Sequence, residues 1–350
     1  MMYRPFELEV FVDLSTLCNA GCPQCHRTAT DNKLKKADWL PLLQWSLEDF
    51  KKAFPPDCLD IISKFSICGT WGDPVMNKDI KEIIEYIVKT NSKILINLDT
   101  NGSIRDETWW WELGIIAGKS LRVVFAVDGS TQEMHQKYRR FTNLDKVLKN
   151  MQAISETNSF VEGHTILFKH NQEHIEDIKK LCLDNGAKKY RVTQSDRFNE
   201  RGADGKYFYF ENEHGKQETL EITTYDPDNG FIAHTDKKIL EKEINCRWKK
   251  SNRILINIDG QVLPCCYFVN TFYKNKFTIT NKKFENHYVI KNYNEKENNI
   301  FYKPLLQIIK ESEWFNQTLP NSWSSDNPVE QCKKHCSSLT NTKHQLKAYL

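Results

Sequence analysis

Short apolar segments alternate with longer amphipathic ones over roughly the first half of this 350-residue chain. The short segments have the length and β-branched content of strands, and six stand out, at residues 8–13, 65–68, 94–98, 121–127, 165–168 and 190–192. Between them, apolar residues recur with helical spacing, most clearly at Ile80, Ile83, Ile84 and Ile87. Strands that alternate with helices in this way form a parallel sheet. Because the pattern ends near residue 195, the sequence predicts an α/β fold whose first domain is a partial (β/α)6 barrel.

The loss of periodicity after residue 195 divides the chain into two domains and a connector. We expect the barrel over residues 1–200, a connector that includes a hairpin over 201–244, and a small α+β domain over 245–350. In the last region, residues 253–258 and 261–263 flank Asp259-Gly260, a pair that supplies the positive φ angles of a tight hairpin turn.

An insertion at about 270–303 interrupts the second domain. It contains seven Lys and three Glu, with eight Phe or Tyr and eight Asn among them. Lysines interleaved with aromatic residues also occur in proteins that bind single-stranded nucleic acid. Because Arg is absent from the insertion, a solvated surface is the simpler interpretation. A nucleic-acid partner is therefore not favoured, although the composition leaves it open.

The composition describes a globular protein without a strong overall charge. Lys plus Arg number 49 against 46 Asp plus Glu, a net charge of +3, so no global field attracts nucleic acid or an anionic membrane. No run of 18 apolar residues occurs, and the first residues lack the apolar core of a signal peptide. We therefore expect a cytoplasmic protein with no membrane partner. Eleven cysteines in such a protein are better explained as metal ligands than as disulfides, because cytosolic thiols stay reduced.

The sharpest local signal is a run of three cysteines, Cys18, Cys22 and Cys25, directly after the first expected strand. A four-iron cluster takes four thiolates, and no fourth cysteine lies nearby, since the next one is Cys58. A cluster bound here has one iron without a protein ligand, and that iron is free to bind a substrate or cofactor. Structural zinc with His26 as fourth ligand is the alternative, but adjacent Cys25 and His26 do not easily point at one tetrahedral ion.

A second group of cysteines lies in the C-terminal region. Cys246 and Cys265 flank the expected hairpin, and Cys332 and Cys336 form a C-x3-C pair. Four thiols are what a second four-iron cluster needs, although a zinc site fits the spacing equally well. Cys266 is treated as a spare thiol, because neighbouring residues seldom bind the same cluster without strain. The remaining cysteines lie in apolar settings typical of core residues: Cys58, Cys68 and Cys182.

These features together resemble the radical S-adenosylmethionine (SAM) enzymes over about residues 7–195. Besides the cysteine run, the resemblance rests on Gly69-Thr70-Trp71-Gly72-Asp73-Pro74, on Asp99-Thr100-Asn101-Gly102, and on Ala126-Val127-Asp128-Gly129 with the following His135 and Tyr138-Arg139. In that family the open iron binds the amino and carboxylate groups of SAM. The resemblance implies SAM contacts from five residues: Gly72, Asp73, Asn101, Asp128 and Arg139.

The sequence departs from the family pattern at four positions. The residue before the third cysteine is usually aromatic and is Gln24 here. Trp71 replaces a glycine, Asp73 replaces a glutamate, and Ala126 stands where a serine that contacts ribose is frequent. These changes leave the cluster cysteines in place and concern the SAM contacts.

The C-terminal cysteines, with the Gly260-x4-Cys265 spacing, resemble the twitch domain, the shortened form of the SPASM domain, which carries one auxiliary [4Fe-4S] cluster. The resemblance implies an oxidoreductase or modifying enzyme that takes an electron from a donor such as flavodoxin or ferredoxin, cleaves SAM reductively and abstracts hydrogen from a substrate carbon. It identifies no catalytic side chain. A peptide or protein is the first candidate substrate, and an aminoglycoside-type or nucleoside small molecule is the second. A zinc-binding interaction protein without catalysis is the alternative from another class.

Overall fold

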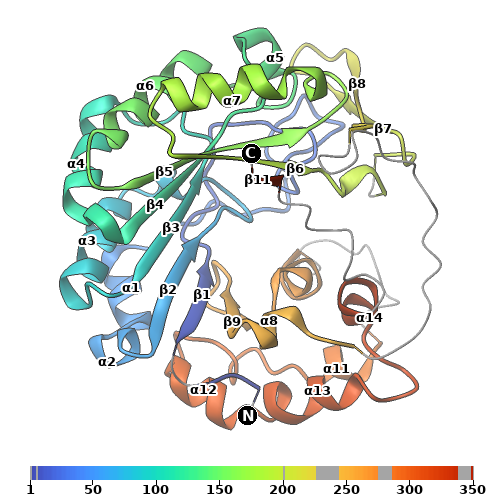
Figure 1. Cartoon of the computed structure of the whole chain (residues 1–350). Coiled ribbons are helices and arrows are strands. Elements are labelled where there is room, and N and C mark those ends of the chain that lie inside the picture. The colour runs from blue at the N-terminus through green and yellow to red at the C-terminus, as the bar shows by residue number, and fades with distance from the viewer. Residues whose placement is uncertain are drawn as a thin grey trace.

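Six parallel strands follow one another across a curved sheet in chain order (Figure 1). The structure is a computed structural model that describes residues 2–4, 7–199, 202–225, 244–274, 286–337 and 348–349. The strands are β1 (Leu8–Val12), β2 (Ile62–Ile67), β3 (Leu95–Thr100), β4 (Leu121–Ala126), β5 (Phe160–Leu167) and β6 (Lys189–Gln194). Each overlaps an expected segment, and β5 begins earlier than its apolar part indicated. The partial (β/α)6 barrel is therefore confirmed.

Helices cover the outer face of this sheet (Figure 1). They are α1 (Leu47–Ala53), α2 (Pro56–Leu59), α3 (Ile80–Thr90), α4 (Glu107–Ala117), α5 (Gln132–Gln136), α6 (Leu144–Ser155) and α7 (Ile175–Asp184). In α3 the buried residues are those whose spacing predicted the helix: Ile80, Ile83, Ile84 and Ile87. The Asp106 and Asn143 side chains accept hydrogen bonds from main-chain N–H groups and begin α4 and α6. Within the described ranges, no helix is both long enough and apolar enough to span a membrane.

The inner face of the sheet is charged. Glu162 on β5 is fully buried and forms ion pairs with Arg122 of β4 and Arg191 of β6. Glu9 on β1 pairs with Lys64 of β2 and with Arg253. A closed barrel is usually filled by layers of Val, Ile and Leu, whereas here ion pairs occupy inward positions of neighbouring strands.

The C-terminal region continues the barrel sheet. β9 (Arg253–Ile256) pairs parallel with β1, and β10 (Val262–Leu263) pairs antiparallel with β9. At the other edge, β11 (Ala348–Tyr349) pairs antiparallel with β6, which gives the nine-stranded order β10-β9-β1-β2-β3-β4-β5-β6-β11. Sequence analysis predicts the β9–β10 hairpin but places it in a separate domain. The pairing of β9 with β1 makes it an edge of the barrel.

The hairpin loop also differs from its prediction. Asn257 N–H donates to the Gln261 carbonyl, which leaves residues 258–260 as a three-residue loop. Within this loop the positive φ belongs to Gly260, at 81°. A three-residue hairpin loop that ends in a left-handed residue matches this geometry, in place of a two-residue Asp-Gly turn.

Short helices complete the C-terminal region and gather beside β9, in orange and red in Figure 1. They are α8 (Arg247–Lys250), α9 (Val269–Phe272), α11 (Tyr288–Lys291), α12 (Leu305–Glu311), α13 (Leu319–Ser322) and α14 (Glu330–Cys336). Residues 2–3 also belong here, because Met2 N–H donates to Asn316 at 2.8 Å and the Tyr3 hydroxyl donates to the Pro264 carbonyl at 3.2 Å. The first residues of the chain thus help to build its C-terminal region.

Part of the insertion at 270–303 belongs to the core of this region. The ring of Phe272 lies 4.1 Å from that of Tyr293, whose ring lies 5.0 Å from Trp314. The Tyr293 hydroxyl donates to the Val262 carbonyl at 2.9 Å. Residues 275–285 lie outside the described residues. In the described part, then, these two aromatic residues pack inward, which differs from the solvated surface that composition favoured.

The connector contains a two-stranded hairpin formed by β7 (Tyr207–Glu211) and β8 (Gln217–Glu221). Its apolar residues pack against the loop that follows β1: Phe208, Phe210 and Leu220 cluster with Ala20, Cys22 and Leu34. Arg140 forms ion pairs with Glu213 and Glu218 of the hairpin. The remainder of the connector, at 226–243, lies outside the described residues.

The buried ion pairs of the inner face predict a stability effect. We expect Glu162→Ala to lower the free energy of unfolding by about 3 kcal/mol, because it leaves Arg122 and Arg191 facing each other without a counter-charge. Urea unfolding followed by circular dichroism measures this. Glu176→Ala is the matched control, since that side chain is 74% exposed and its pair with Lys179 contributes less than about 1 kcal/mol. Equal losses in the two variants would contradict a structural role for the inner-face charges.

Candidate functional site

Cys18, Cys22 and Cys25 lie on the loop between β1 and α1. Cys22 is buried, and the other two are half-buried. The loop is tightly turned, since Ala20 N–H donates to the Cys18 sulfur at 3.4 Å and Cys25 N–H donates to the Cys22 carbonyl at 3.0 Å. Burial raises the pKa of the Cys18 thiol, and the nearby Asp73, Cys22 and Cys25 add to the rise. The three thiols are therefore close together on one loop.

The donor set of this loop consists of three thiols. In the part of the chain that the structure describes, no group of three or more His, Cys, Asp or Glu side chains is arranged to hold one metal ion. A four-iron cluster is larger and takes its thiolates from separate directions. The next cysteine along the chain, Cys58, is buried in the hydrophobic core at α2 and does not join the loop. Three thiols without a fourth is the set that leaves one iron open.

The loop after β2 docks directly onto the cysteine loop. A Cβ atom at Gly72 would lie 2.5 Å from the Leu17 carbonyl oxygen and 2.6 Å from that of Ser15, so only glycine fits there. Asp73 N–H donates to the same Leu17 carbonyl at 2.7 Å. The close approach of Gly72 to Leu17, the residue before Cys18, therefore sets the distance between the two loops.

The Asp73 carboxylate is buried and hydrogen-bonded to other groups of the protein. It is 4% exposed and accepts hydrogen bonds from Asn101 N–H at 2.7 Å and from the Thr100 hydroxyl at 3.0 Å. Burial raises its pKa to about 6. The Asn101 amide, held in this way, donates to Asn19 at 2.8 Å and to the Cys18 sulfur at 3.8 Å. Asp73 thus positions Asn101, and Asn101 reaches the cysteine loop.

Asp128 positions Arg139, as Asp73 positions Asn101. It is fully buried, accepts Ile166 N–H at 2.6 Å and forms an ion pair with Arg139 Nε at 2.5 Å. A second guanidinium nitrogen, Arg139 Nη1, donates to the Cys22 sulfur at 3.9 Å. All five residues that the resemblance assigned to SAM are therefore gathered beside the cysteine loop. The two carboxylates are occupied by protein groups, and the two donors are the side chains that reach the thiols.

His135 holds the Asp128 main chain in place through hydrogen bonds of both ring nitrogens. Its Nδ1 accepts the Asp128 N–H at 3.1 Å, and its Nε2 lies 3.0 Å from the Thr142 hydroxyl. Burial, together with the positive charge of Arg139, lowers the pKa of His135 to about 3. The ring is therefore neutral at physiological pH, which suits an acceptor from a main-chain N–H.

The four C-terminal cysteines of the second set also converge. Cys246, Cys265, Cys332 and Cys336 are all buried, at 5 to 9% exposure. Cys332 and Cys336 share one face of α14, and the Cys246 thiol donates to Cys336, which lowers the pKa of Cys336. Burial raises the pKa of Cys265, and the neighbouring Cys266, Cys332 and Cys336 add to the rise. The structure gathers this set from three segments, and it leaves Cys266 exposed.

The two cysteine sets are neighbours. His26, next to Cys25, hydrogen-bonds through Nδ1 to Asn270 of α9 at 3.2 Å. Cys68, at the end of β2, lies within electrostatic reach of Asp13 and Asp99 on the barrel strands and of Cys266 on the other side. Cys266 therefore lies near the carboxyl end of β2.

Sequence analysis missed several residues around these sets. Tyr3 lies beside the second set, since burial and then the charges of Cys246, Cys265 and Cys332 raise its pKa. Tyr267 and His335 stack at a centroid distance of 3.6 Å and join the two halves of that set. The histidine inside the C-x3-C pair is a weak sequence signal for the stacking of Tyr267 on His335. No sequence signal indicates the position of Tyr3 beside the second set, because no local pattern links residue 3 to residues 246–336.

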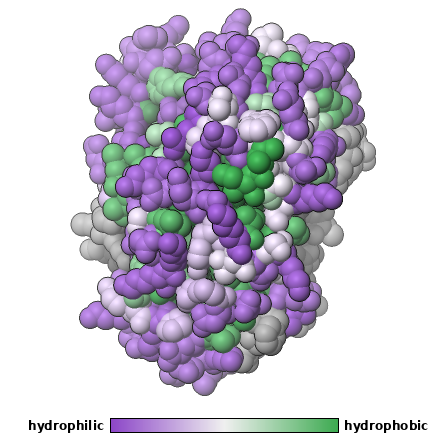
Figure 2. Space-filling model, turned by 90° about the vertical axis from the view of Figure 1, so that its left-hand side faces the viewer, coloured by the Kyte–Doolittle hydropathy of each residue, from purple (hydrophilic) through white to green (hydrophobic). Residues whose placement is uncertain are grey.

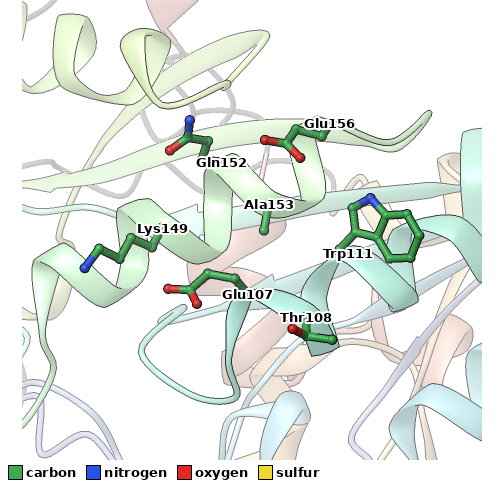
Figure 3. A pocket seen from close by; sticks show the side chains of 7 residues that line it. All are labelled: Glu107, Thr108, Trp111, Lys149, Gln152, Ala153 and Glu156. Carbon is green, nitrogen blue, oxygen red and sulfur yellow. The ribbon is translucent and has the colours of Figure 1, made fainter.

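One surface hollow is lined by none of the cysteines. It measures about 460 Å³ and lies between α4 and α6, where Figure 3 shows its lining residues Glu107, Thr108, Trp111, Lys149, Gln152, Ala153 and Glu156. Figure 2 shows the outer helical side of the molecule, which is mainly hydrophilic with separate hydrophobic patches. None of the predicted site residues lines the hollow, so we place the site at the cysteine loop.

The buried neutral His135 predicts a pH dependence of folding. Its pKa is about 3 in the folded protein and about 6.5 in the unfolded chain, so acid protonates the unfolded chain first. His135 should therefore lower stability by about 1.4 kcal/mol for each pH unit below 6.5, down to the folded pKa. Urea midpoints at pH 7.5 and 5.5 measure the effect, and His135→Gln should reduce the difference between them. His174→Gln, a change at an exposed residue directly before α7, is the control. An unchanged difference in the His135 variant would contradict the assignment.

The chain matches two family models. Residues 12–182 match the Radical SAM superfamily, and residues 246–337 match the SPASM iron–sulfur cluster-binding domain. A search of curated proteins finds no match. These two models imply SAM, a SAM-binding [4Fe-4S] cluster and an auxiliary iron–sulfur cluster as cofactors, which favours iron over the zinc alternative at both cysteine sets.

Two solved structures share this fold. SuiB of Streptococcus suis bound to S-adenosylmethionine has a TM-score of 0.59 at 15% identity, covering 94% of this chain and 72% of that one. The structure of anSMEcpe with bound AdoMet has a TM-score of 0.55 at 14% identity, covering 87% of this chain and 78% of that one. The chain therefore belongs to the radical SAM superfamily and carries a C-terminal SPASM domain.

Proposed function

We propose that this enzyme abstracts hydrogen from a carbon atom of a peptide or protein. In the proposal, Cys18, Cys22 and Cys25 hold the SAM-cleaving cluster. The auxiliary cluster is held by the second set: Cys246, Cys265, Cys332 and Cys336. The observation that carries the proposal is the pairing of an incomplete three-thiol loop with a complete, buried four-thiol set that adjoins it.

A four-iron cluster held by Cys18, Cys22 and Cys25, with one iron open, would supply the electron for the reductive cleavage of SAM. The protein's own part is to position reactants and to exclude water around them. Asn101 and Arg139 are the proposed SAM-binding side chains, because they reach the cysteine loop. Gly72, Asp73 and Asp128 are proposed to support that contact by fixing the loops around it.

The inner face of the barrel is the proposed location of the substrate. It lies between the two cysteine sets and presents polar side chains, including exposed Asp99 on β3 and His164, which hydrogen-bonds to Thr193 at 2.8 Å. Cys266 of the C-terminal region lies near Cys68, which follows β2. Polar groups on an accessible inner face suit a substrate with hydrogen-bonding groups of its own, such as a peptide.

Relatives of the same fold support a peptide. SuiB is described in complex with the precursor peptide SuiA, and anSMEcpe with peptides such as Cp18Cys. The experiment that tests the substrate class measures 5′-deoxyadenosine from reduced enzyme and SAM, with and without a library of synthetic peptides. A parallel panel of aminoglycosides and nucleosides tests the second candidate. Stimulation by small molecules alone would overturn the peptide assignment.

The first set of cysteines predicts a specific loss of iron. Replacing Cys18, Cys22 and Cys25 by Ala should lower iron from about eight to about four atoms per chain, the content of one four-iron cluster. Formation of 5′-deoxyadenosine should cease, because no other site holds an open iron. Iron analysis and chromatography of the products measure both effects in anaerobically purified protein. Persistent SAM cleavage in this variant would falsify the assignment.

The second set predicts different effects from replacing a buried thiol, Cys336, and an exposed one, Cys266. Cys336→Ala should remove the auxiliary cluster and substrate turnover while SAM binding persists, because Cys336 is buried among the other three thiols. Cys266→Ala is the matched control and should keep both clusters, because Cys266 is exposed. Iron content and electron paramagnetic resonance distinguish the variants. If the wild type holds one zinc and a single cluster, the assignment of the second set is wrong.

A further inference from the structure

Two side-chain donors point at two of the three cluster cysteines. Asn101 Nδ2 lies 3.8 Å from the Cys18 sulfur, and Arg139 Nη1 lies 3.9 Å from the Cys22 sulfur. Sulfur is larger than oxygen and accepts hydrogen bonds at these longer distances. One donor follows β3 and the other follows α5, so each reaches a different thiol from a different part of the barrel.

Each donor is held by a buried carboxylate. Asp73 accepts the main-chain N–H of Asn101 at 2.7 Å, and Asp128 accepts Arg139 Nε. Each carboxylate also accepts a second main-chain N–H: Asp73 that of Val75, two residues further along, at 3.0 Å, and Asp128 that of Ile166 on β5 at 2.6 Å. A buried carboxylate is stable only when hydrogen bonds and opposite charge compensate it. The donors are therefore fixed in place by interactions that do not involve the cysteines.

Hydrogen bonds to the sulfurs of an iron–sulfur cluster raise its reduction potential. The reason is electrostatic, because the reduced cluster carries one more negative charge than the oxidised one and N–H groups stabilise that charge. Arg139 contributes a charged donor, which forms a stronger hydrogen bond than the neutral amide of Asn101. Its effect on the potential should therefore be the larger of the two.

We propose that Asn101 and Arg139 tune the reduction potential of the SAM-cleaving cluster by donating to the Cys18 and Cys22 thiolates, and that Asp73 and Asp128 position these donors. This inference rests on the proposed function of the three cysteines. It gives four of the five SAM landmark residues, all except Gly72, a second role, which operates before SAM binds. A role confined to SAM binding would leave the SAM-free cluster unaltered.

The test is a redox titration of the cluster without SAM, followed by electron paramagnetic resonance. The relevant signal is identified as the one missing from the variant in which Cys18, Cys22 and Cys25 are Ala. At a fixed potential, Arg139→Met should lower the ratio of reduced to oxidised cluster by about tenfold, a shift of about 59 mV for one electron. Asn101→Leu should lower the ratio less, because its donor is neutral.

Three further variants separate tuning from general damage. Arg140→Gln removes a positive charge from the neighbouring residue, whose guanidinium pairs with Glu213 and Glu218 instead, and should change the ratio less than about twofold. Arg139→Lys and Asp128→Asn keep a similar side chain and should give intermediate shifts. A cluster that assembles with full iron content but titrates at a lower potential supports the proposal.

The outcomes are distinguishable. If Arg139→Met and Asn101→Leu weaken SAM binding but leave the SAM-free potential at the wild-type value, these residues act through SAM alone and the inference is overturned. If Arg139→Met fails to assemble a cluster, Asn101→Leu and Arg139→Lys carry the same test. If the triple cysteine variant keeps all its iron and its signal, the proposed function itself fails.

Discussion

Two buried carboxylates, Asp73 and Asp128, hold together the loops around the three N-terminal cysteines. Asp73 follows β2 and accepts the Val75 and Asn101 main-chain N–H groups and the Thr100 hydroxyl. Asp128 follows β4 and accepts the Ile166 main-chain N–H and the Arg139 guanidinium. Because an uncompensated carboxylate in such a place is strongly unfavourable, the surrounding loops have one arrangement that satisfies it. The direction of the Asn101 and Arg139 side chains follows from that arrangement. The cysteine loop is therefore shaped by groups that do not bind iron.

The second constraint is the junction between the barrel and the SPASM domain. β9 extends the barrel sheet at β1, the strand that leads into the cysteine loop, so the two domains share one hydrogen-bonded framework. The contact between His26 and Asn270 ties the two cysteine sets at a second point. A site built across such a shared framework has a distance between its two metal centres that the sheet determines.

Much of the fold followed from local patterns, and the rest required partners that no local pattern names. Apolar strands and the helical spacing of Ile80 to Ile87 indicated the barrel, because a buried face imposes its period on the sequence. The two cysteine sets were visible in their spacing. The pairing of β9 with β1 was not, since four apolar residues do not specify a neighbour. Asp73 and Asp128 were recognised as site residues, but the groups that occupy them come from distant segments. The contacts of Tyr3 with the C-terminal region, and of the β7–β8 hairpin with the cysteine loop, also join distant segments, and no local pattern indicates them.

The contact between Tyr3 and Pro264 joins residues that are 261 positions apart, and β9 is nearly as far from β1 along the chain. During synthesis on the ribosome, β1 leaves the exit tunnel long before β9 exists, so one edge of the barrel has unpaired N–H and C=O groups throughout that time. An unpaired edge strand is a site where chains associate with each other. Contacts of such long range also slow folding. The nascent barrel of this enzyme is therefore exposed to aggregation until the SPASM hairpin emerges, and its first cysteine loop acquires its final surroundings only then.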